Sequence, residues 1–232
     1  MRVALLSDIH SNLAALQAVL AAIDRDRLRP DVVLSLGDTV GYNAQPNECL
    51  ALLFSRGVRC ILGNHDWAAT GGTPKGFNQS AVAGVDHTRK LLTPENRKRI
   101  AEFPATLRFQ VGLGELAVYH GSPRDPLMEY VFPDAGIDEF SALAKSAGEP
   151  TFVALGHTHI PMRRKADDTW FLNPGSVGQP RDGDPRASFG LLDGETAEFT
   201  IVRVPYDVDA TEAANRAAGL PEAISRRLRK GL

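Results

Sequence analysis

Short apolar runs that each end in a polar, glycine-containing cluster recur along the chain and constrain its fold more than any other feature. They are VALLSDIH (3–10), VVLSLGD (32–38), VRCILGNHD (58–66), LAVYHGS (116–122), TFVALGHTH (151–159) and TWFLNPGS (169–176). Runs of roughly four to six residues rich in Val, Leu and Ile, without a helical period, are typical of buried strands. The sequence therefore predicts a sheet with a largely buried set of strands.

The segments between the first of these runs have helical patterns. Apolar residues recur at spacings of three and four in NLAALQAVLAAIDRDRL (12–28), which predicts an amphipathic helix with Asn12 as its cap. A second helix is predicted over PNECLALLFSR (46–56), because Pro46 suits the first turn of a helix. The resulting order of strand, helix, strand, helix, strand predicts an α/β fold with a parallel sheet and right-handed crossovers.

The stretch 67–105 interrupts this alternation. Its first part is loop-like, and residues 79–102 predict a helix that is broken near Pro94. We expect 67–105 to be a helical insertion over the active-site face, where it would act as a cap or a substrate wall. The loop is marked by Gly71, Gly72, Thr73, Pro74 and Gly76.

Short strands are predicted to dominate from about 106 to 205, including 187–193 and 198–204. A C-terminal helix is expected at about 210–230. Its late positive charges suit the negative end of a helix dipole, which favours a solvated helix over a tail that binds an anionic partner. Repeats, low-complexity tracts and clear linkers are not found, so 1–232 is predicted to form a single domain.

Charge and hydropathy argue against a dedicated nucleic-acid binder and against a membrane-spanning protein. The chain has 26 basic and 28 acidic residues and a net charge of −2, whereas dedicated nucleic-acid binders usually carry a basic excess. Its apolar runs are far shorter than the roughly 18 residues that span a bilayer, and the N-terminal run 3–6 is too short for a signal peptide. Cys49 and Cys60 lie in or beside apolar runs and are predicted to be buried reduced thiols. We expect a cytoplasmic protein.

Side chains that can bind metals stand at the ends of the apolar runs. Ligands bind outside the carboxyl ends of strands in open α/β sheets, so these side chains are expected to converge. Of the six histidines, only His87 lies outside the clusters, and it is predicted to be a surface helix residue. A spacing of two would place both members of a pair on one side if strand geometry persists. The candidate ligands are Asp8, His10, Asp38, Asn64, His120, His157 and His159.

The number of candidate ligands indicates whether the site holds one metal ion or two. A single ion with an open position needs about three protein ligands, whereas seven suit two ions roughly 3.5–4 Å apart that share a carboxylate. Imidazole, carboxylate and amide groups suit Mn, Fe, Zn, Ni or Co, and the clusters contain no thiolate. Glycines in GD, GNHD and GHTH would let the backbone turn sharply and let bulky ligands crowd together.

Five motifs, in this order, resemble the signature of the calcineurin-like metallophosphoesterase superfamily. They are DIH (8–10), GD (37–38), GNHD (63–66), HG (120–121) and GHTH (156–159), and the match spans residues 1 to about 195. The segments DIHSNLAALQAVL, GDTVGYNAQPNECL and NPGSVGQPRDGDP further resemble the bacterial YfcE-type phosphodiesterases, a group often labelled as diadenosine-tetraphosphatase-like. This resemblance implies a four-layer α-β-β-α sandwich.

The resemblance also implies roles for the individual residues. A hydroxide held between two divalent metal ions, with Mn²⁺ favoured over Fe, Zn, Ni or Co, would attack phosphorus in line. His65 would donate a proton or a hydrogen bond to the leaving-group oxygen, and Asp66 would fix its orientation. One metal would be bound by Asp8, His10 and His159, the other by Asn64, His120 and His157, and Asp38 would bridge them.

Contacts with the substrate are less marked in the sequence. Asn12 is a candidate to contact phosphate as well as a helix cap, and Arg181 is a second candidate because a guanidinium binds phosphate well. Tyr42 follows the loop of Asp38 and could stack on a base or aryl group. Selectivity would come from the 67–105 insertion and from the loop 176–186.

The function predicted on these grounds is hydrolysis of phosphodiesters, including cyclic nucleotides, with a small phosphate ester as the partner. The alternatives are a phosphomonoesterase or protein phosphatase, and a hydrolase of dinucleoside polyphosphates at the same site. A nuclease is disfavoured by the near-neutral charge, and a non-catalytic scaffold by the complete set of ligands together with His65. The sequence leaves the native metals, the physiological substrate and the oligomeric state open.

Overall fold

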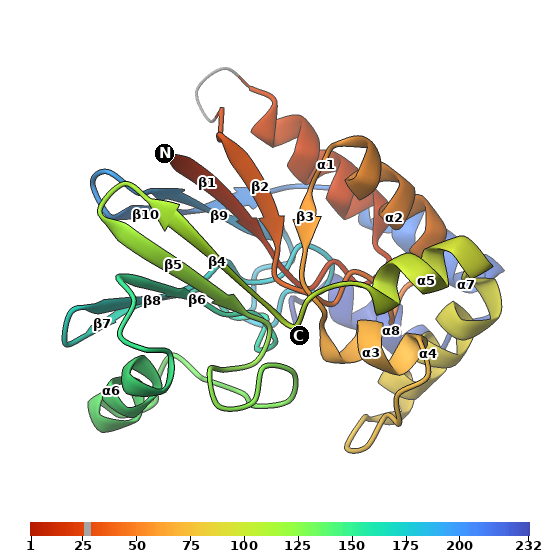
Figure 1. Ribbon diagram of the computed structural model, residues 1–232. Helices are drawn as coiled ribbons and strands as arrows, with labels where there is room; N and C mark the ends of the chain where they lie inside the picture. Colours follow the sequence, from red (N-terminus) through yellow and green to blue (C-terminus); the bar gives the residue numbers. More distant parts are fainter. Residues whose placement is uncertain (26–28) are drawn as a thin grey trace.

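Two five-stranded sheets form the framework of the computed structural model, which describes residues 1–25 and 29–232 (Figure 1). The first sheet holds β1 (Arg2–Leu6), β2 (Val32–Ser35), β3 (Arg59–Cys60), β9 (Ala187–Asp193) and β10 (Glu198–Val204) in the order β10-β9-β1-β2-β3. The second holds β4 (Thr106–Val111), β5 (Gly114–Tyr119), β6 (Phe152–Ala154), β7 (Met162–Ala166) and β8 (Thr169–Asn173) in the order β4-β5-β6-β8-β7.

Each sheet contains three neighbouring parallel strands and two antiparallel pairings. In the first sheet β1, β2 and β3 are parallel, with Leu5 opposite Leu34, and β9 and β10 add antiparallel strands on the other side of β1. In the second sheet β5, β6 and β8 are parallel, while β4 and β7 are antiparallel. The parallel arrangement predicted for the first three strands is confirmed.

Helices cover the outer faces of the two sheets. The helices are α1 (Leu13–Ile23), α2 (Pro46–Ser55), α3 (Asn64–Ala69), α4 (Gln79–Leu91), α5 (Pro94–Ala101), α6 (Ile137–Ser146), α7 (Val208–Ala217) and α8 (Glu222–Leu228). Leu16 of α1 belongs to the same buried cluster as Phe189 of the first sheet. Phe140 of α6 packs against Phe171 of the second sheet, with ring centroids 5.0 Å apart.

The middle of the molecule is an apolar layer between the two sheets. Leu5 and Leu34 of the first sheet and Val118 and Phe152 of the second are almost fully buried in this layer. Burial of each such side chain stabilises the fold by roughly 1.5–3 kcal/mol. With helices outside and two sheets inside, the predicted four-layer α-β-β-α sandwich is confirmed (Figure 1).

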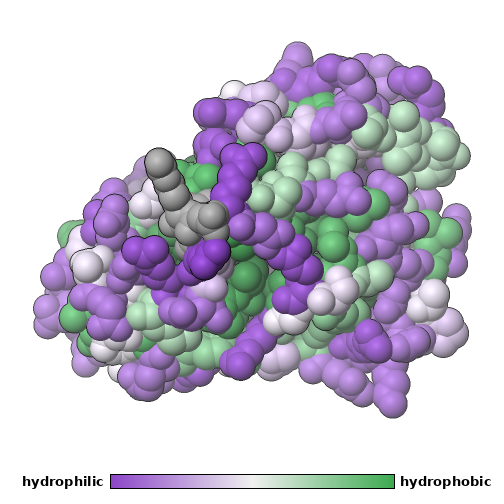
Figure 2. Space-filling view, turned by 90° about the horizontal axis from the view of Figure 1, so that it is seen from above, coloured by the Kyte–Doolittle hydropathy of each residue, from purple (hydrophilic) through white to green (hydrophobic). Residues whose placement is uncertain are grey.

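Hydrophobic residues gather in the middle of the face shown in Figure 2, and hydrophilic residues surround them. Cys49 and Cys60 are buried and unpaired, which confirms the prediction of two buried thiols. Across residues 1–25 and 29–232, none of the helices has both the length and the apolar character needed to cross a membrane.

The helices of the first half largely follow the sequence prediction. Helix α1 ends at Ile23, and residues 26–28 of the predicted helix 12–28 lie outside the described residues. The helical pattern over 79–102 is broken as predicted, because Thr93 caps α5 by accepting a hydrogen bond from the Asn96 N–H at 3.1 Å and Pro94 starts that helix.

Two helical predictions in the second half were wrong. The C-terminal segment forms two helices instead of one, because Gly219 has a φ of +69° and Pro221 precedes α8. Helix α6 was not predicted within the strand-rich stretch 106–205. Its pattern was nevertheless present, since Phe140, Leu143 and Ala144 lie at helical spacing and are all buried.

Candidate metal centre

Six of the seven candidate ligands lie in loops that follow the strands, and the seventh, Asn64, starts a helix at the same end of the sandwich. Asp8 stands two residues beyond β1, Asp38 three beyond β2 and His157 three beyond β6, whereas His120 directly follows β5. Asn64 is the first residue of α3. Because the parallel strands of both sheets end at the same edge, side chains separated by more than a hundred residues meet there.

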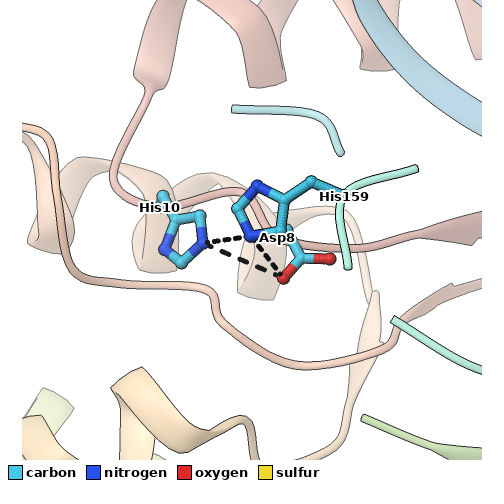
Figure 3. A group of neighbouring side chains, drawn as sticks. All are labelled: Asp8, His10 and His159. Atoms are coloured by element: carbon cyan, nitrogen blue, oxygen red, sulfur yellow. Dashed lines mark hydrogen bonds and ion pairs between the residues drawn. The ribbon is translucent and has the colours of Figure 1, made fainter. Parts of the chain in front are cut away.

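The first group consists of Asp8, His10 and His159 (Figure 3). His159 Nε2 lies 3.2 Å from His10 Nε2 and 3.2 Å from Asp8 Oδ1, and His10 Nε2 lies 3.8 Å from the same oxygen. All three side chains are buried. Among the described residues, Asp8 Oδ1 has no hydrogen-bond partner. Three donor atoms thus point at one another around a shared space.

The second group consists of Asn64, His120 and His157. His120 Nε2 lies 2.9 Å from Asn64 Oδ1 and 3.1 Å from His157 Nδ1. The carboxylate of Asp38 joins the two groups, since its Oδ2 lies 3.6 Å from His10 Nε2 and 3.5 Å from His120 Nε2. One carboxylate oxygen therefore faces both sets of donors.

The backbone around these ligands is strained. Asp8, His10, Asp38, His157 and His159 have φ values of 53°, 49°, 53°, 67° and 62°, in the left-handed region that non-glycine residues rarely adopt. Each such residue costs on the order of 1 kcal/mol, and such residues concentrate at functional sites. The free energy of folding is therefore less favourable by this cost, and in return these side chains point into the cluster.

Ligands two residues apart were expected to lie on one side because of strand geometry, and this reason was wrong. Strand geometry does not persist to them, because β1 ends at Leu6 and β6 ends at Ala154. Asp8 and His10 converge because both adopt the left-handed conformation, and so do His157 and His159.

Glycine is required where the ligand loops touch. A Cβ on Gly63 would lie 2.1 Å from Asp38 Oδ1, and a Cβ on Gly41 would lie 2.4 Å from His65 Nδ1. Both distances are far below van der Waals contact. The prediction that glycines let bulky ligands crowd together is confirmed at Gly63 of the GNHD motif. Gly41, outside the predicted motifs, makes the same allowance for His65.

Hydrogen bonds to carbonyl groups fix the tautomer of each candidate histidine ligand. Since a carbonyl only accepts, the ring nitrogen bonded to it carries the proton, and the other ring nitrogen presents its lone pair to the cluster. The pairs are His10 Nδ1 with Val40 (3.2 Å), His120 Nδ1 with Leu36 (2.8 Å), His159 Nδ1 with Gln179 (2.5 Å) and His157 Nε2 with Met128 (3.2 Å).

The electrostatics of the site fit divalent cations. Burial lowers the pKa of His10, His120 and His159 and takes that of His157 to about 2, so the imidazoles are neutral. Burial, together with nearby carboxylates, raises the pKa of Asp38. Lone pairs and carboxylates that face one another in a buried space repel, and a cation among them removes that repulsion. These nitrogen and oxygen donors suit Mn, Fe, Zn, Ni or Co.

His65 lies beside the ligands in a stack of aromatic rings. Its ring centroid is 4.8 Å from that of Tyr42 and 4.5 Å from that of Phe77, both at an interplanar angle of 29°. Burial lowers its pKa well below the usual value. His65 lines an inner cavity of about 60 Å³ together with Asp38 and Arg181. Its ring is therefore neutral and faces the space beside the candidate bridge.

The predicted contact between Asp66 and the His65 ring was wrong. The Asp66 carboxylate instead accepts hydrogen bonds from the backbone N–H groups of Thr39 (3.2 Å), Val40 (3.0 Å) and Gly63 (3.1 Å). Side chains in the first turn of a helix point back toward its N-terminus, which directs Asp66 to the loop after β2. Burial raises the pKa of Asp66 to about 6. Aromatic stacking holds the His65 ring instead.

Asn12 does not face the cavity, so its predicted contact with substrate was wrong. Its side chain is fully buried. Its Oδ1 accepts from the Ala15 N–H at 3.2 Å and from the Thr211 hydroxyl at 2.9 Å, and its Nδ2 donates to the Gly178 carbonyl at 2.9 Å. The prediction that Asn12 caps the first helix is confirmed.

Arg181 does line the inner cavity. Its Nη2 donates to the Tyr42 hydroxyl at 3.2 Å and to Gln179 Oε1 at 2.9 Å, while its buried Nε has no partner among the described residues. Tyr42 is only 2 % exposed and stacks on His65, so the predicted stacking of Tyr42 on a substrate base was wrong. Tyr42 itself lines the inner cavity, where its ring stacks on His65 and its hydroxyl accepts a hydrogen bond from Arg181.

Sequence reasoning missed the aromatic residues around the cavity. Tyr130 stacks on His157 with ring centroids 3.7 Å apart, and Phe77 stacks on His65. Both residues lie in irregular loops, where no periodicity marks them. His87, predicted to be a surface residue, lies on α4 half-buried, with its Nε2 bonded to the Ala44 carbonyl at 3.1 Å.

The chain is similar to several known proteins over most of its length. A family model for the calcineurin-like phosphoesterase superfamily domain matches residues 1–197. Protein MJ0912 of Methanocaldococcus jannaschii is 34% identical over 243 residues, which cover 97% of this chain and 96% of that protein.

Two further relatives were found. The crystal structure of a metallophosphoesterase from Sphaerobacter thermophilus is 34% identical, with a TM-score of 0.84, and the match covers 100% of this chain and 99% of that one. The phosphodiesterase YfcE of Escherichia coli (strain K12) is 45% identical over 43 residues, which cover 18% of this chain and 23% of that protein. The full-length match to the Sphaerobacter thermophilus structure supports the same fold. The match to YfcE covers only a local segment.

Proposed function

Because this chain belongs to the calcineurin-like phosphoesterase superfamily, we propose that it hydrolyses phosphodiesters at a pair of divalent cations. The family and the class of enzyme predicted from the sequence, a hydrolase of phosphoric esters, are confirmed by the family match. The dinuclear site, the diester preference and the roles of single residues are our proposal. Its main support is the position of Asp38, whose Oδ2 faces His10 at 3.6 Å and His120 at 3.5 Å.

The proposal assigns each donor group to one cation. We assign Asp38 to both, because one of its oxygens faces both groups. When bound, two such cations lower the pKa of a water toward neutrality and offset charge on the phosphoryl oxygens. We favour Mn²⁺ and keep Fe, Zn, Ni and Co as candidates, since the donor set suits all five. One cation would be held by Asp8, His10 and His159, and the other by Asn64, His120 and His157.

His65 is assigned the contact with the leaving group. Its neutral ring can donate one N–H hydrogen bond, and it lines the inner cavity beside Asp38. Tyr42 and Phe77 both stack against this ring and restrict its plane. Arg181 is assigned to a non-bridging phosphate oxygen, because its buried Nε lacks a partner in the described part of the chain.

The preference for diesters and the organisation of the chain are also proposals. The local match to phosphodiesterase YfcE supports a diester substrate. We propose that residues 1–232 form one domain in which the insertion 67–105 walls the substrate site, since Phe77 of this insertion contacts His65. The substrate would be a small phosphate ester whose phosphate occupies the inner cavity of about 60 Å³.

The test is hydrolysis of bis(p-nitrophenyl) phosphate by protein first stripped of metal and then reloaded with Mn²⁺, Zn²⁺, Ni²⁺ or Co²⁺. We expect two bound ions per chain, activity only after loading, and a single ¹⁸O from labelled water in the phosphoryl product. The p-nitrophenyl monoester should be cleaved more slowly. Activity that survives complete removal of metal would overturn the dinuclear site, and faster cleavage of the monoester would overturn the diester preference.

A further inference from the structure

A larger pocket opens directly beside the candidate metal centre. It has a volume of about 510 Å³, within the range of about 300–1,000 Å³ typical of small-molecule sites. Asn64 and His157, two of the candidate ligands, form part of its lining. Asn64, His157, Phe77 and Tyr130 also line the inner cavity, so the two spaces adjoin each other. A group attached to a phosphate held at the ligands would extend into this pocket.

The walls of the pocket are aromatic. Trp67 and Phe77 come from α3 and the loop after it, whereas Met128 and Tyr130 come from the loop after β5. We call this space, with these four residues, the aromatic pocket. Phe77 and Tyr130 each stack on a histidine of the site, and Tyr130 remains 49% exposed.

The indole and the thioether of the aromatic pocket suit a flat, unsaturated group. Gly72 packs against the Trp67 indole so closely that a Cβ there would lie 2.2 Å from the ring, which fixes the indole in place. The thioether of Met128 adapts to aromatic partners. Aromatic side chains and a thioether favour a planar ring system over a flexible aliphatic chain.

The charge at the rim is positive. Lys75 is exposed and lines the pocket, and its lining contains no acidic side chain. An anionic substrate would therefore meet no repulsion as it enters, and a lysine could contact its phosphate or hydroxyl groups.

We propose that the aromatic pocket binds a planar aromatic substituent of the phosphate ester, with a nucleobase as the chemical class, so that the substrates are nucleotide esters. This inference rests on the proposed function, since the phosphate of the substrate must lie at the candidate ligands. Trp67 and Tyr130 are the specificity-determining residues, because they supply stacking surface without belonging to the set of donors that face the cations.

The first test compares two inhibitors that differ only in the base. AMP and ribose 5-phosphate share the sugar and the phosphate, and each is measured against hydrolysis of bis(p-nitrophenyl) phosphate by the metal-loaded protein. We expect AMP to inhibit with a Ki lower by roughly tenfold, the order expected for one stacked base. Trp67→Leu and Tyr130→Leu should each reduce this ratio toward one, while the Ki of inorganic phosphate stays unchanged.

The second test does not depend on turnover. The chain has two tryptophans, Trp67 and Trp170, and Trp170 lies on β8, away from the pocket. A Trp170→Phe variant therefore reports on Trp67 alone and also serves as a matched control in the inhibition assay, where its Ki ratio should equal that of the unmodified chain. AMP should quench its emission, and ribose 5-phosphate should not.

The two tests separate this inference from the proposed function. A chain that hydrolyses diesters but shows equal Ki values for AMP and ribose 5-phosphate, with no quenching, overturns the aromatic pocket and leaves the hydrolase intact. A chain in which AMP quenches Trp67 but no diester is cleaved supports the pocket and overturns the proposed function. Circular dichroism of Trp67→Leu and Tyr130→Leu shows whether both variants fold; if the Ki ratio is unchanged in folded variants, the assignment of these residues is wrong.

Discussion

Asp38 Oδ1 accepts a hydrogen bond of 2.8 Å from the backbone N–H of His65. This contact uses one carboxylate oxygen and leaves Oδ2 to face both groups of donors. It also ties the loop after β2 to the start of α3, so that the candidate bridge and the candidate hydrogen-bond donor keep a constant separation. The predictions below begin with these two residues.

We expect Asp38→Ala to abolish metal binding and activity, because both cations lose a shared ligand. Bound metal should fall close to zero, and activity should fall by about 100-fold or more. Metal content is measured by mass spectrometry after dialysis. Asp134→Asn, at an exposed acid remote from the cluster, serves as the control. Two ions retained by Asp38→Ala would show that this carboxylate is not the bridge.

His65→Ala should keep both metals but lose most turnover. All seven proposed ligands remain in this variant, although a ring nitrogen of His65 lies within 4.8 Å of donor atoms of His10 and Asp38. A hydrogen bond to the leaving group contributes roughly 10²–10⁴-fold to the rate. The measurement pairs kcat with metal content, and His87→Ala is the matched histidine control. If the His65 variant loses metal in the same proportion as activity, its assigned role is refuted.

Asp66→Ala should destabilise the protein by about 3 kcal/mol, since three backbone N–H groups would lose a charged acceptor in a buried place. The free energy of unfolding in urea measures this loss, and Asp86→Ala on the surface of α4 is the control. We also expect weaker metal binding, because Asp66 holds the loop of Asp38. Unchanged stability together with a shifted pH–rate profile would instead support an orienting role toward His65.

Arg181→Ala should raise KM about tenfold while both metals stay bound, because the guanidinium faces the cavity and no donor group of the clusters depends on it. Arg181→Lys should recover part of the affinity, since an ammonium keeps the charge but not the planar geometry. Arg226→Ala, on the exposed side of α8, is the control. An unchanged KM would show that Arg181 acts only as a support for Tyr42.

The buried thiol of Cys60 predicts a loss of stability at alkaline pH. Burial raises its pKa to about 12, whereas an unfolded thiol has a pKa of about 8.5. Because the folded pKa is raised, the contribution to stability is complete below about pH 8.5 and is lost as pH rises toward 12.

Cys60→Ala isolates this effect. The free energy of unfolding should fall faster with pH in the unmodified chain than in the variant, so that the difference between them shrinks by about 2 kcal/mol from pH 8.5 to pH 10. Chemical denaturation at several pH values gives both curves, and Cys49 is present in each protein. A difference that stays constant with pH would contradict burial of the Cys60 thiol.

The candidate ligands could be predicted from the sequence because each is marked locally. An apolar run indicates a buried strand, and a histidine or aspartate just beyond its end indicates where the side chain will lie. Asp8, Asp38 and His120 each follow a strand in this way. The parallel order of the first three strands follows from equally local patterns, because apolar spacing distinguishes a strand from a helix.

Contacts between distant segments could be decided only by the tertiary structure. Asp66 bonds to the loop after β2, and Asn12 bonds to Thr211, nearly two hundred residues away. The aromatic pocket joins α3 to a loop that follows β5, although neither segment carries a periodic pattern. The type of a side chain and its place on a strand are local properties, whereas its hydrogen-bond and stacking partners depend on which surfaces meet when the chain packs.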